Sequence, residues 1–264
     1  MNKTTLVIGD AHVESHDNLD RFEALGELIV DTLPDTIVQI GDFLSLDSLS
    51  AWDLNKRAKM EGRRLSEELK NGREAVERMM RPLARLRANQ REMKKKIYNP
   101  RKIAILGNHE DRLYRYLDTH PELIDVVDPF RSIGFERYGW ERVDYRDYIY
   151  VEGVAFTHTP MNGMNRPISG NNIMSMAAKG HTTSVIFGHT HKFQIGTDTR
   201  HGNGARQTMA INCGCYFEGV PEYARGSSAS KDWWRGILIL EHDEFENGIF
   251  GIKAIRMEQL MGRY

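Results

Sequence analysis

Three observations predict an α/β fold for this chain of 264 residues. Short apolar runs end in a glycine followed by polar residues, and an amphipathic helical pattern lies between the first two runs. The second half of the chain consists of short apolar segments separated by glycine-containing turns. Hydrophobic residues make up 40% and charged residues 28%, an ordinary composition for a globular protein.

The first half of the chain contains three predicted strands. Thr4–Ile8 and Thr36–Ile40 are apolar runs of strand length, and Ile103–Leu106 is the third. Between the first two, Asn18 is positioned to cap a helix whose apolar residues have helical spacing. Those apolar residues are Leu19, Phe22, Leu25, Leu28 and Ile29.

The second half is predicted to contain mainly strands. A short helix is expected after Asp111, and a second one at Asn171–Lys179. Glycine-containing turns separate the apolar segments, which is typical of sheet structure. The predicted strands are Asp147–Val151, Val154–Thr157, Ser184–Phe187, Lys192–Thr199, Gln207–Asn212, Gly236–Leu240 and Gly248–Ile255.

A basic segment separates the second and third predicted strands. Between Lys56 and Lys102 there are 17 Lys and Arg residues against 6 Asp and Glu, whereas the whole chain has a net charge of −1. This asymmetry is one indication of a polyanionic partner, but composition alone favours the simpler interpretation, a long solvated helix that carries charge for solubility. We interpret residues 48–99 as a helical insertion within a single domain of residues 1–264.

The insertion carries an apolar stripe with alternating spacings of four and three residues, long enough for a helix of about 50 Å. Pro82 lies inside the stripe and should kink the helix or begin a new one. An αα-hairpin lying on the domain is one interpretation, and a coiled-coil contact in a homodimer is the other. The stripe consists of Leu65, Leu69, Val76, Met79, Leu83, Leu86, Met93 and Ile97.

Composition also bears on where the protein works. No apolar run approaches the roughly 18 residues that a transmembrane helix needs, so no membrane contact is expected. The first residues meet a charge before any apolar run of signal-peptide length, which argues against secretion. The chain has only two cysteines, Cys213 and Cys215, and a reducing compartment is the simpler interpretation. We therefore expect a cytoplasmic protein.

Five short motifs, each at the end of a predicted strand, carry side chains that bind metal ions. Asp, His and Asn side chains offer oxygen and nitrogen ligands that suit Mn²⁺, Fe or Zn²⁺. Any one of these motifs alone is weak, because a histidine after a strand is more often a hydrogen-bonding residue than a ligand. The motifs are Asp10-x-His12, Gly41-Asp42, Gly107-Asn108-His109-Glu110, Thr157-His158 and Gly188-His189-Thr190-His191.

Together the five motifs resemble those of the calcineurin-like metallophosphoesterase superfamily, in the same order, over Thr4 to Phe193. The overall pattern is similar to phage or prophage members. The resemblance implies a two-sheet α/β/β/α sandwich flanked by helices, with the site at one end of the sheets. Two positions depart from the family pattern: Ser45 stands where a further acidic residue is common, with Asp47 two positions beyond, and Thr159 stands where glycine is common.

The resemblance implies a site for two divalent ions, Mn²⁺ first and Fe, Zn²⁺ or Ni²⁺ as alternatives. It assigns His109 to stabilising the transition state or protonating the leaving oxygen, and Glu110 to orienting a ligand. His16 and His181 are weaker candidates for ligands, and Cys213 and Cys215 are either a metal-binding pair or small residues near the site. The implied ligands are Asp10, His12, Asp42 and His191 for the first ion, and Asp42, Asn108, His158 and His189 for the second.

Physical chemistry explains why one carboxylate should be shared. Two divalent ions about 4 Å apart repel each other by roughly 15–20 kcal/mol at an effective dielectric constant of 20, so anions must lie between them. The resemblance gives that place to Asp42. A hydroxide bridging the two ions would then attack phosphorus, because metal coordination lowers the pKa of water.

The expected function is hydrolysis of phosphodiester bonds, with nucleic acid as the first substrate. The insertion leaves the chain after Asp42 and returns before Asn108, so both of its ends are expected at the mouth of the site, where its charge would attract a polyanion. The loop from Tyr216 to Arg225 offers aromatic rings and an arginine for contact with bases, or packs under the sheet.

The alternative is a phosphatase or phosphodiesterase for a small nucleotide or phosphomonoester, with the insertion forming a homodimer. A third possibility, a non-catalytic scaffold, is disfavoured because every implied ligand is present.

Overall fold

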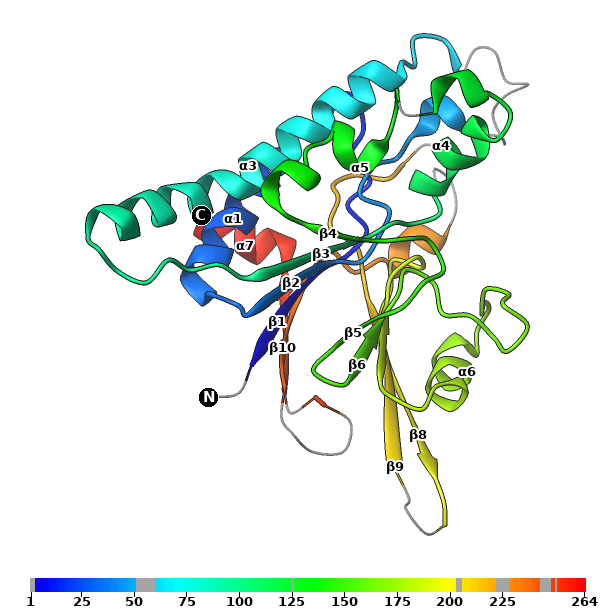
Figure 1. The fold of residues 1–264 in the computed structure, drawn as a ribbon. Coiled ribbons are helices and arrows are strands. Elements are labelled where there is room, and N and C mark those ends of the chain that lie inside the picture. The colour runs from blue at the N-terminus through cyan, green and yellow to red at the C-terminus, as the bar shows by residue number, and fades with distance from the viewer. Residues whose placement is uncertain are drawn as a thin grey trace.

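The computed structural model describes residues 3–50, 60–124, 126–202, 206–221, 228–242, 248–249 and 251–264. Within these residues the strands form two sheets that face each other, with helices on the outer sides (Figure 1). The predicted two-sheet α/β sandwich is therefore confirmed. The first sheet has the order β11 (Gly251–Arg256), β10 (Gly236–Glu241), β1 (Thr4–Ile8), β2 (Thr36–Gln39), β3 (Arg101–Ile105) and β4 (Glu141–Val143). The second has the order β5 (Ile149–Val151), β6 (Val154–Phe156), β7 (Val185–Phe187), β9 (Arg206–Cys213) and β8 (Phe193–Arg200).

The strands that lead into the predicted motifs run parallel to their neighbours. In the first sheet β1, β2 and β3 are parallel, and in the second β6 is parallel to β7. The carboxyl ends of parallel strands meet at one edge of a sheet, so the segments after β1, β2, β3, β6 and β7 come together. This topology is what gathers the five motifs.

All ten predicted strands are present, with ends that match or shift by up to three residues. β4 was not predicted, because it has only three residues and two of them are charged. The last strand, β11, begins at Gly251 rather than at Gly248. A C-terminal helix, α7 (Met257–Arg263), follows it and was also not predicted.

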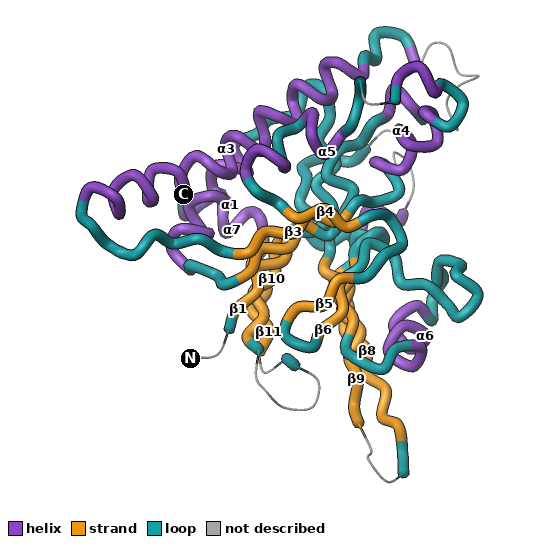
Figure 2. The backbone as a smooth tube through the Cα atoms, viewed as in Figure 1, coloured by secondary structure: helices purple, strands orange, loops and turns teal. Residues whose placement is uncertain are grey.

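Helices cover the outer side of each sheet (Figure 2). α1 (Asp20–Thr32), α3 (Leu65–Glu92) and α7 pack against the first sheet, and α6 (Ile173–Gly180) packs against the second. α4 (Glu110–Leu117) begins directly after the third motif, and α5 (Pro129–Ser132) is a single turn. Short 3-10 turns lie at Asp47–Leu49, Pro121–Leu123, Glu136–Tyr138 and Ser228–Asp232. No helix among the described residues has the length and apolar character needed to cross a membrane.

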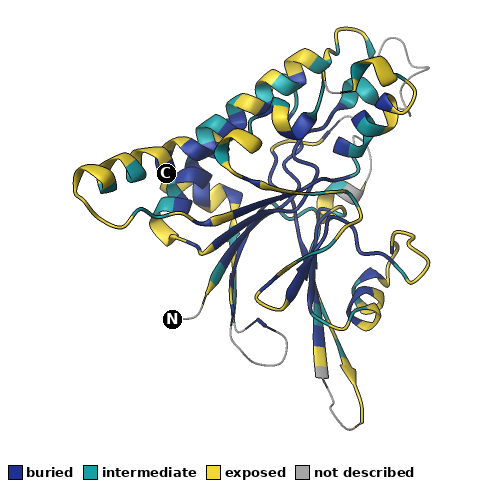
Figure 3. Cartoon of the chain, viewed as in Figure 1, coloured by how far each residue is buried: buried dark blue, intermediate teal, exposed yellow. Residues whose placement is uncertain are grey.

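The central strands of both sheets are buried (Figure 3). Their side chains alternate between two apolar layers. In β1, Leu6 and Ile8 pack toward the helices, whereas Val7 packs between the two sheets. This period of two is what an interior strand with both faces covered requires. Both layers are dry, and the central strands that carry the motifs are therefore held firmly on each side.

The helix of the predicted insertion differs from expectation. α3 is one continuous helix that contains Pro82, so no new helix begins at the proline within the described residues 60–99. The proline ring lies against Gly26 of α1, where a Cβ atom on Gly26 would come within 2.8 Å of it. Close packing of the two helices compensates for the lost hydrogen bond. Residues 51–59 of the insertion lie outside the described residues, so its full extent of 48–99 stays a prediction.

Part of the positive charge of α3 is paired with acidic residues of the same chain. Arg78 pairs with Asp20 at 2.9 Å, Arg81 with Glu23 at 3.9 Å, and Arg85 with Glu27. These three acidic residues lie along α1, so the arginines of α3 and the carboxylates of α1 form a ladder between parallel helices. The local excess of positive charge in the sequence is therefore partly an internal ion-pair pattern.

The prediction that both ends of the insertion lie at the mouth of the site is wrong. The backbone N–H of Arg101 donates to Asp35 O at 3.0 Å, and the Tyr98 hydroxyl donates to Pro34 O at 2.5 Å. These contacts place the returning end beside the start of β2, at the opposite edge of the sheet from Asp42. The sequence interpretation neglected the length of β3, which spans about 16 Å between the insertion and Asn108.

Candidate metal centre and active site

The structure brings together all seven predicted metal ligands at the carboxyl ends of five strands. Asp10 and His12 follow β1, Asp42 follows β2, and Asn108 follows β3. His158 follows β6, and His189 and His191 follow β7, so both sheets contribute. Five of the seven are buried; Asn108 is half-buried, and His189 is exposed. The strand edges of two sheets thus converge on one small volume.

Asp42 lies at the centre of the cluster. Its Oδ2 atom is 3.2 Å from His158 Nε2, 3.8 Å from His12 Nε2 and 3.9 Å from His109 Nε2. No other carboxylate in the described part of the chain has three imidazoles so close. A carboxylate in this position is placed to contact two ions at once.

The remaining side chains fall into two groups on either side of Asp42. On one side, Asp10 Oδ2 is 3.2 Å from His191 Nε2, and His12 completes the group. On the other, His158 Nε2 lies 3.0 Å from Asn108 Oδ1, with His189 close by. Within each group of Asp and His residues the candidate ligand atoms lie within 4.8 Å of one another. The roles of these residues as ligands remain a prediction.

Unpartnered polar atoms show that the cluster suits cations. His12 Nε2 and His191 Nε2 face each other at 3.0 Å, a contact that a single proton or a shared cation can satisfy. Asp10 Oδ1 and His12 Nδ1 are buried and have no hydrogen-bond partner among the described residues. Buried polar groups are rarely left unpaired. Oxygen and imidazole donors in this arrangement fit Mn²⁺, Fe or Zn²⁺.

The backbone of the cluster is strained. Four of the predicted ligands have positive φ angles: 41° at His12, 48° at Asp42, 71° at His189 and 61° at His191. Residues other than glycine seldom adopt this left-handed conformation, and each instance costs of the order of 1–3 kcal/mol. Such strain persists where surrounding structure enforces it, and it concentrates at functional sites.

Two glycines allow the central carboxylates to lie against the backbone. A Cβ atom on Gly107 would collide with the Asp42 carboxylate, and one on Gly188 would collide with the Asp10 carboxylate. The Asp42 carboxylate accepts the His109 backbone N–H at 2.8 Å, and the Asp10 carboxylate accepts that of His189 at 2.8 Å. Glycine at these positions is therefore a steric requirement of the site.

Glu110 fixes the loop that carries Asp42. Its Oε2 atom accepts the backbone N–H groups of Asp42 at 3.0 Å and Gly107 at 2.8 Å, and Oε1 accepts that of Leu44 at 2.8 Å. Burial and the Asp42 carboxylate raise the pKa of Glu110 to about 7, although these hydrogen bonds act in the opposite direction. Glu110 therefore positions Asp42 through the backbone and does not contact a candidate ligand atom.

The close imidazoles and carboxylates shift each other's protonation. Burial alone would raise the pKa of Asp42, but His158 and His109 hold it well below its usual value. Burial alone would lower the pKa of His158, but Asp42 and Asp10 raise it to about 9. A metal ion bound at the cluster would replace the proton of His158 as the positive charge that interacts with the Asp42 and Asp10 carboxylates.

His109 is held beside the cluster through both of its ring nitrogens. Nδ1 lies 2.6 Å from Ser45 O, and Nε2 lies 3.0 Å from Arg112 Nη2. Sequence reasoning did not identify Arg112. Arg112 lies three residues after His109 at the start of a predicted helix, and this spacing places both residues on one helix face. That spacing is the sequence feature that could have identified Arg112.

A cavity of about 230 Å³ opens onto the cluster. The ring of Trp233 lies 4.7 Å from that of His191, centroid to centroid, and Phe217 lies 5.2 Å from the rings of both His12 and His191. Phe217 belongs to the loop expected near the site, whereas Trp233 was not predicted. The cavity is lined by His12, Asp42, Asn108, His109, His189, Thr190, His191 and Trp233.

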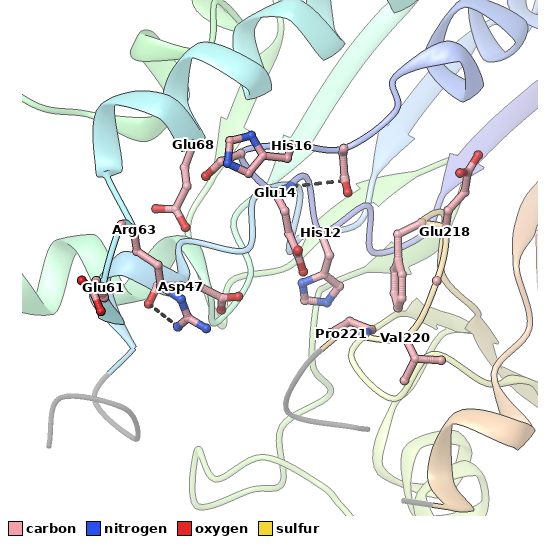
Figure 4. A pocket seen from close by; sticks show the side chains of 15 residues that line it. His12, Glu14, His16, Asp47, Glu61, Arg63, Glu68, Glu218, Val220 and Pro221 are labelled. Atoms are coloured by element: carbon pink, nitrogen blue, oxygen red, sulfur yellow. Dashed lines mark hydrogen bonds between the residues drawn. The ribbon is translucent and has the colours of Figure 1, made fainter. Parts of the chain in front are cut away.

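A second cavity, of about 810 Å³, lies beside the first and shares His12 with it (Figure 4). Six carboxylates line it, against one arginine, so its electrostatic character is acidic. Figure 4 shows the side chains of Glu14, Asp47, Glu61, Glu68 and Glu218 around the same space as His12. The acidic residues are Glu14, Asp17, Asp47, Glu61, Glu68 and Glu218, and the arginine is Arg63.

The weaker sequence candidates do not join the cluster. His16 is exposed and lines the second cavity, and His181 Nε2 lies 3.1 Å from the Tyr148 hydroxyl. Cys213 and Cys215 are buried and belong to none of the described groups of metal-binding side chains. Arg225 lies outside the described residues.

Comparison with known proteins agrees with this geometry. Residues 3–193 match the family model described as calcineurin-like phosphoesterase. The Gene 54 protein of Mycobacterium phage D29 is 27% identical over 249 residues, 92% of this chain and 90% of the phage protein. The Gene 54 protein of Mycobacterium phage L5 is 26% identical over 252 residues, with the same coverage. Among solved structures, Pseudomonas putida nuclease MPE has a TM-score of 0.34 and 15% identity, covering 90% of this chain and 84% of that one. The phage relatives fit the predicted phage-type resemblance.

Proposed function

Because the chain belongs to the calcineurin-like phosphoesterase family and is a metal-dependent hydrolase, we propose that it cleaves phosphodiester bonds at the cluster around Asp42. The observation that carries the proposal is the convergence of seven oxygen and nitrogen ligands from five strand ends. We propose two divalent ions, with Mn²⁺ as the first choice. Asp10, His12, Asp42 and His191 would hold one, and Asp42, Asn108, His158 and His189 the other.

The chain's own residues define the reaction geometry. The bound ions would supply activated water and neutralise charge on the phosphoryl group. Asp42 would keep the two ions together, and Glu110 and Gly107 fix its position. His109 lines the smaller cavity 3.9 Å from Asp42, where its ring would stabilise charge on the phosphoryl group or act on the leaving oxygen.

We propose nucleic acid as the first substrate class. Trp233 lines the smaller cavity and offers an aromatic face for a base, an interaction worth about 1–3 kcal/mol. The acidic second cavity opposes a phosphate backbone, so a strand would leave the cluster on the side of His189 and Trp233.

A second candidate, a small nucleotide or phosphomonoester, is favoured by the charge distribution. Such a substrate needs no row of basic residues beside the cluster, and Arg78, Arg81 and Arg85 of α3 are paired with α1. The structure also limits how the insertion could form a homodimer, because Val76, Met79 and Leu83 of the apolar stripe are buried in the core of the chain itself. A homodimer through the insertion would have to use another of its surfaces.

The proposal is tested by hydrolysis of bis-p-nitrophenyl phosphate and p-nitrophenyl phosphate. Metal-free protein refilled with Mn²⁺ should cleave the diester, and Asp42→Ala should lower the rate by about 10³-fold or more because the shared ligand is lost. Asp31→Ala, on the exposed end of α1, is the matched control and should retain the activity. Preference for the monoester would favour the second candidate, and no turnover of either by protein that binds Mn²⁺ would contradict the proposal.

Labelled DNA, labelled RNA and a small cyclic nucleotide then distinguish the substrate classes. Cleavage of a polymer at a higher kcat/KM than the small nucleotide would support nucleic acid. The reverse order would favour the small substrate.

A further inference from the structure

His109 and Arg112 lie on the same face at the start of α4. They are three residues apart, so their side chains project in one direction. His109 lines the smaller cavity, whereas Arg112 is among the described lining residues of neither cavity. The arginine side chain is 16% exposed.

The backbone carbonyl of Ser45 accepts hydrogen bonds from the side chains of both His109 and Arg112. Ser45 O accepts from His109 Nδ1 at 2.6 Å and from Arg112 Nη1 at 2.9 Å. The Arg112 Nη2 group donates to His109 Nε2 at 3.0 Å. Asp47 Oδ1 lies 3.3 Å from Arg112 Nη1 and fixes the guanidinium from the other side. The imidazole is therefore held at both of its nitrogens.

These contacts define the state of the His109 ring. A carbonyl oxygen only accepts hydrogen bonds, so Nδ1 must carry a proton. A guanidinium only donates, so Nε2 must present its lone pair to Arg112. The same Nε2 atom lies 3.9 Å from Asp42 Oδ2, on the side of the cluster. A single tautomer and a single ring orientation satisfy the contacts with Ser45 and Arg112.

We propose that Arg112 is the positioning residue of His109, and that Asp47 acts through Arg112. This inference rests on the proposed function, in which His109 serves the reaction. Asp47 contacts Arg112, and Arg112 contacts the His109 ring, so Asp47 helps to orient the imidazole without a direct contact between its carboxylate and the ring. Arg112 sets the orientation of the His109 ring before substrate binds, and its effect on the turnover rate passes through His109.

A double-mutant cycle tests this role. Arg112→Ala should lower kcat for bis-p-nitrophenyl phosphate by about 10²-fold, within the range for a general acid–base group, while KM changes less than about threefold. In a His109→Ala background the same substitution should cause no further loss, because its effect passes through the imidazole. Arg115→Ala, one turn further along α4 and paired with Asp111, is the matched control and should leave kcat unchanged.

Three results would overturn the proposal. An equal loss in both backgrounds would show that Arg112 acts independently of His109. A rise in KM with kcat unchanged would show that Arg112 binds substrate. A loss of kcat in Arg115→Ala comparable to that in Arg112→Ala would show that the effect comes from the net charge of α4 and not from the contact with His109. Thermal unfolding of each variant separates these results from loss of folded protein.

A spectroscopic readout distinguishes failure of this proposal from failure of the proposed function. In metal-free protein, the ¹⁵N resonances of the His109 ring should report a protonated Nδ1 and a hydrogen-bonded Nε2. In Arg112→Ala, the Nε2 resonance should shift and the ring should exchange between tautomers, and Arg112→Lys should restore part of the wild-type signal. Unchanged spectra would overturn the positioning role. A wild-type protein that cleaves no diester would contradict only the proposed function.

Discussion

The two neighbouring cavities both contain carboxylates and share His12, yet they differ in how their side chains are held. At the cluster onto which the smaller cavity opens, polar atoms from five strand ends approach within 3.0–3.9 Å, and Asp10 and His12 keep unpartnered atoms. In the larger cavity, Asp17 pairs with Arg21, Asp47 with Arg112, and Glu68 with Ser48. Polar atoms that converge without partners indicate a site that binds a metal ion, whereas the charge of the larger cavity indicates only an electrostatic effect on approaching ligands.

The steric fit of the smaller cavity gives the first and largest prediction. Gly107→Ala and Gly188→Ala should each displace a central carboxylate, because the new Cβ atom would overlap Asp42 or Asp10. We expect a loss of diester cleavage of at least about 10²-fold and destabilisation by about 1–3 kcal/mol. Mn²⁺ titration by calorimetry and urea denaturation measure the two effects.

Gly163→Ala and Gly180→Ala are the matched controls for that prediction. Neither position has a neighbouring atom within 4 Å of the added Cβ, and both controls should cleave the diester at the wild-type rate. Wild-type Mn²⁺ affinity in Gly107→Ala would show that the close approach to Asp42 is not a requirement of the site.

A smaller effect is expected from Glu110→Gln. The amide nitrogen cannot accept a hydrogen bond, so one or two of the backbone N–H groups of Asp42, Leu44 and Gly107 would lose their partner. Each unsatisfied group costs about 1–3 kcal/mol, and we expect unfolding free energy to fall by that amount and diester cleavage by about tenfold.

Glu136→Gln, at an exposed ion pair with Arg131, provides the comparison for Glu110→Gln. It should change the unfolding free energy by less than about 1 kcal/mol. A Glu110→Gln protein as stable and as active as this control would refute the role of Glu110 in fixing the Asp42 loop.

The sequence predicted the parts of the molecule that depend on local pattern. Apolar runs followed by Gly-Asp or Gly-His located the strands and the ends at which they meet, because parallel strands place those ends on one edge. The missed elements have weak local patterns: β4 has three residues with two charges, and α7 has seven residues. The close gathering of Asp10, His12, Asp42 and the other ligands followed from topology.

Features that depend on distant partners could not be predicted from the sequence. Pro82 lies inside a continuous helix because Gly26, on another helix, makes room for its ring. The positive charge of α3 was assigned to a polyanion because its partners on α1, such as Asp20, are about 58 residues away in the chain. Arg112 was overlooked for a related reason: its role depends on Ser45 and Asp47, which precede the insertion.

The acidic field of the larger cavity gives the last and smallest prediction. Glu61→Gln combined with Glu218→Gln removes two exposed charges from its wall without touching the cluster. We expect cleavage of an anionic diester to rise by about two- to fivefold at low ionic strength, because the substrate approaches against less repulsion. The gain should fade above about 0.15 M salt, where the Debye length falls to roughly 8 Å.

Glu122→Gln combined with Glu258→Gln is the control for this prediction, because it removes two exposed charges elsewhere and should give no gain in the cleavage rate. An equal rate in both double variants would show that the acidic cavity does not act on the substrate, and the comparison between the two cavities would then rest on geometry alone.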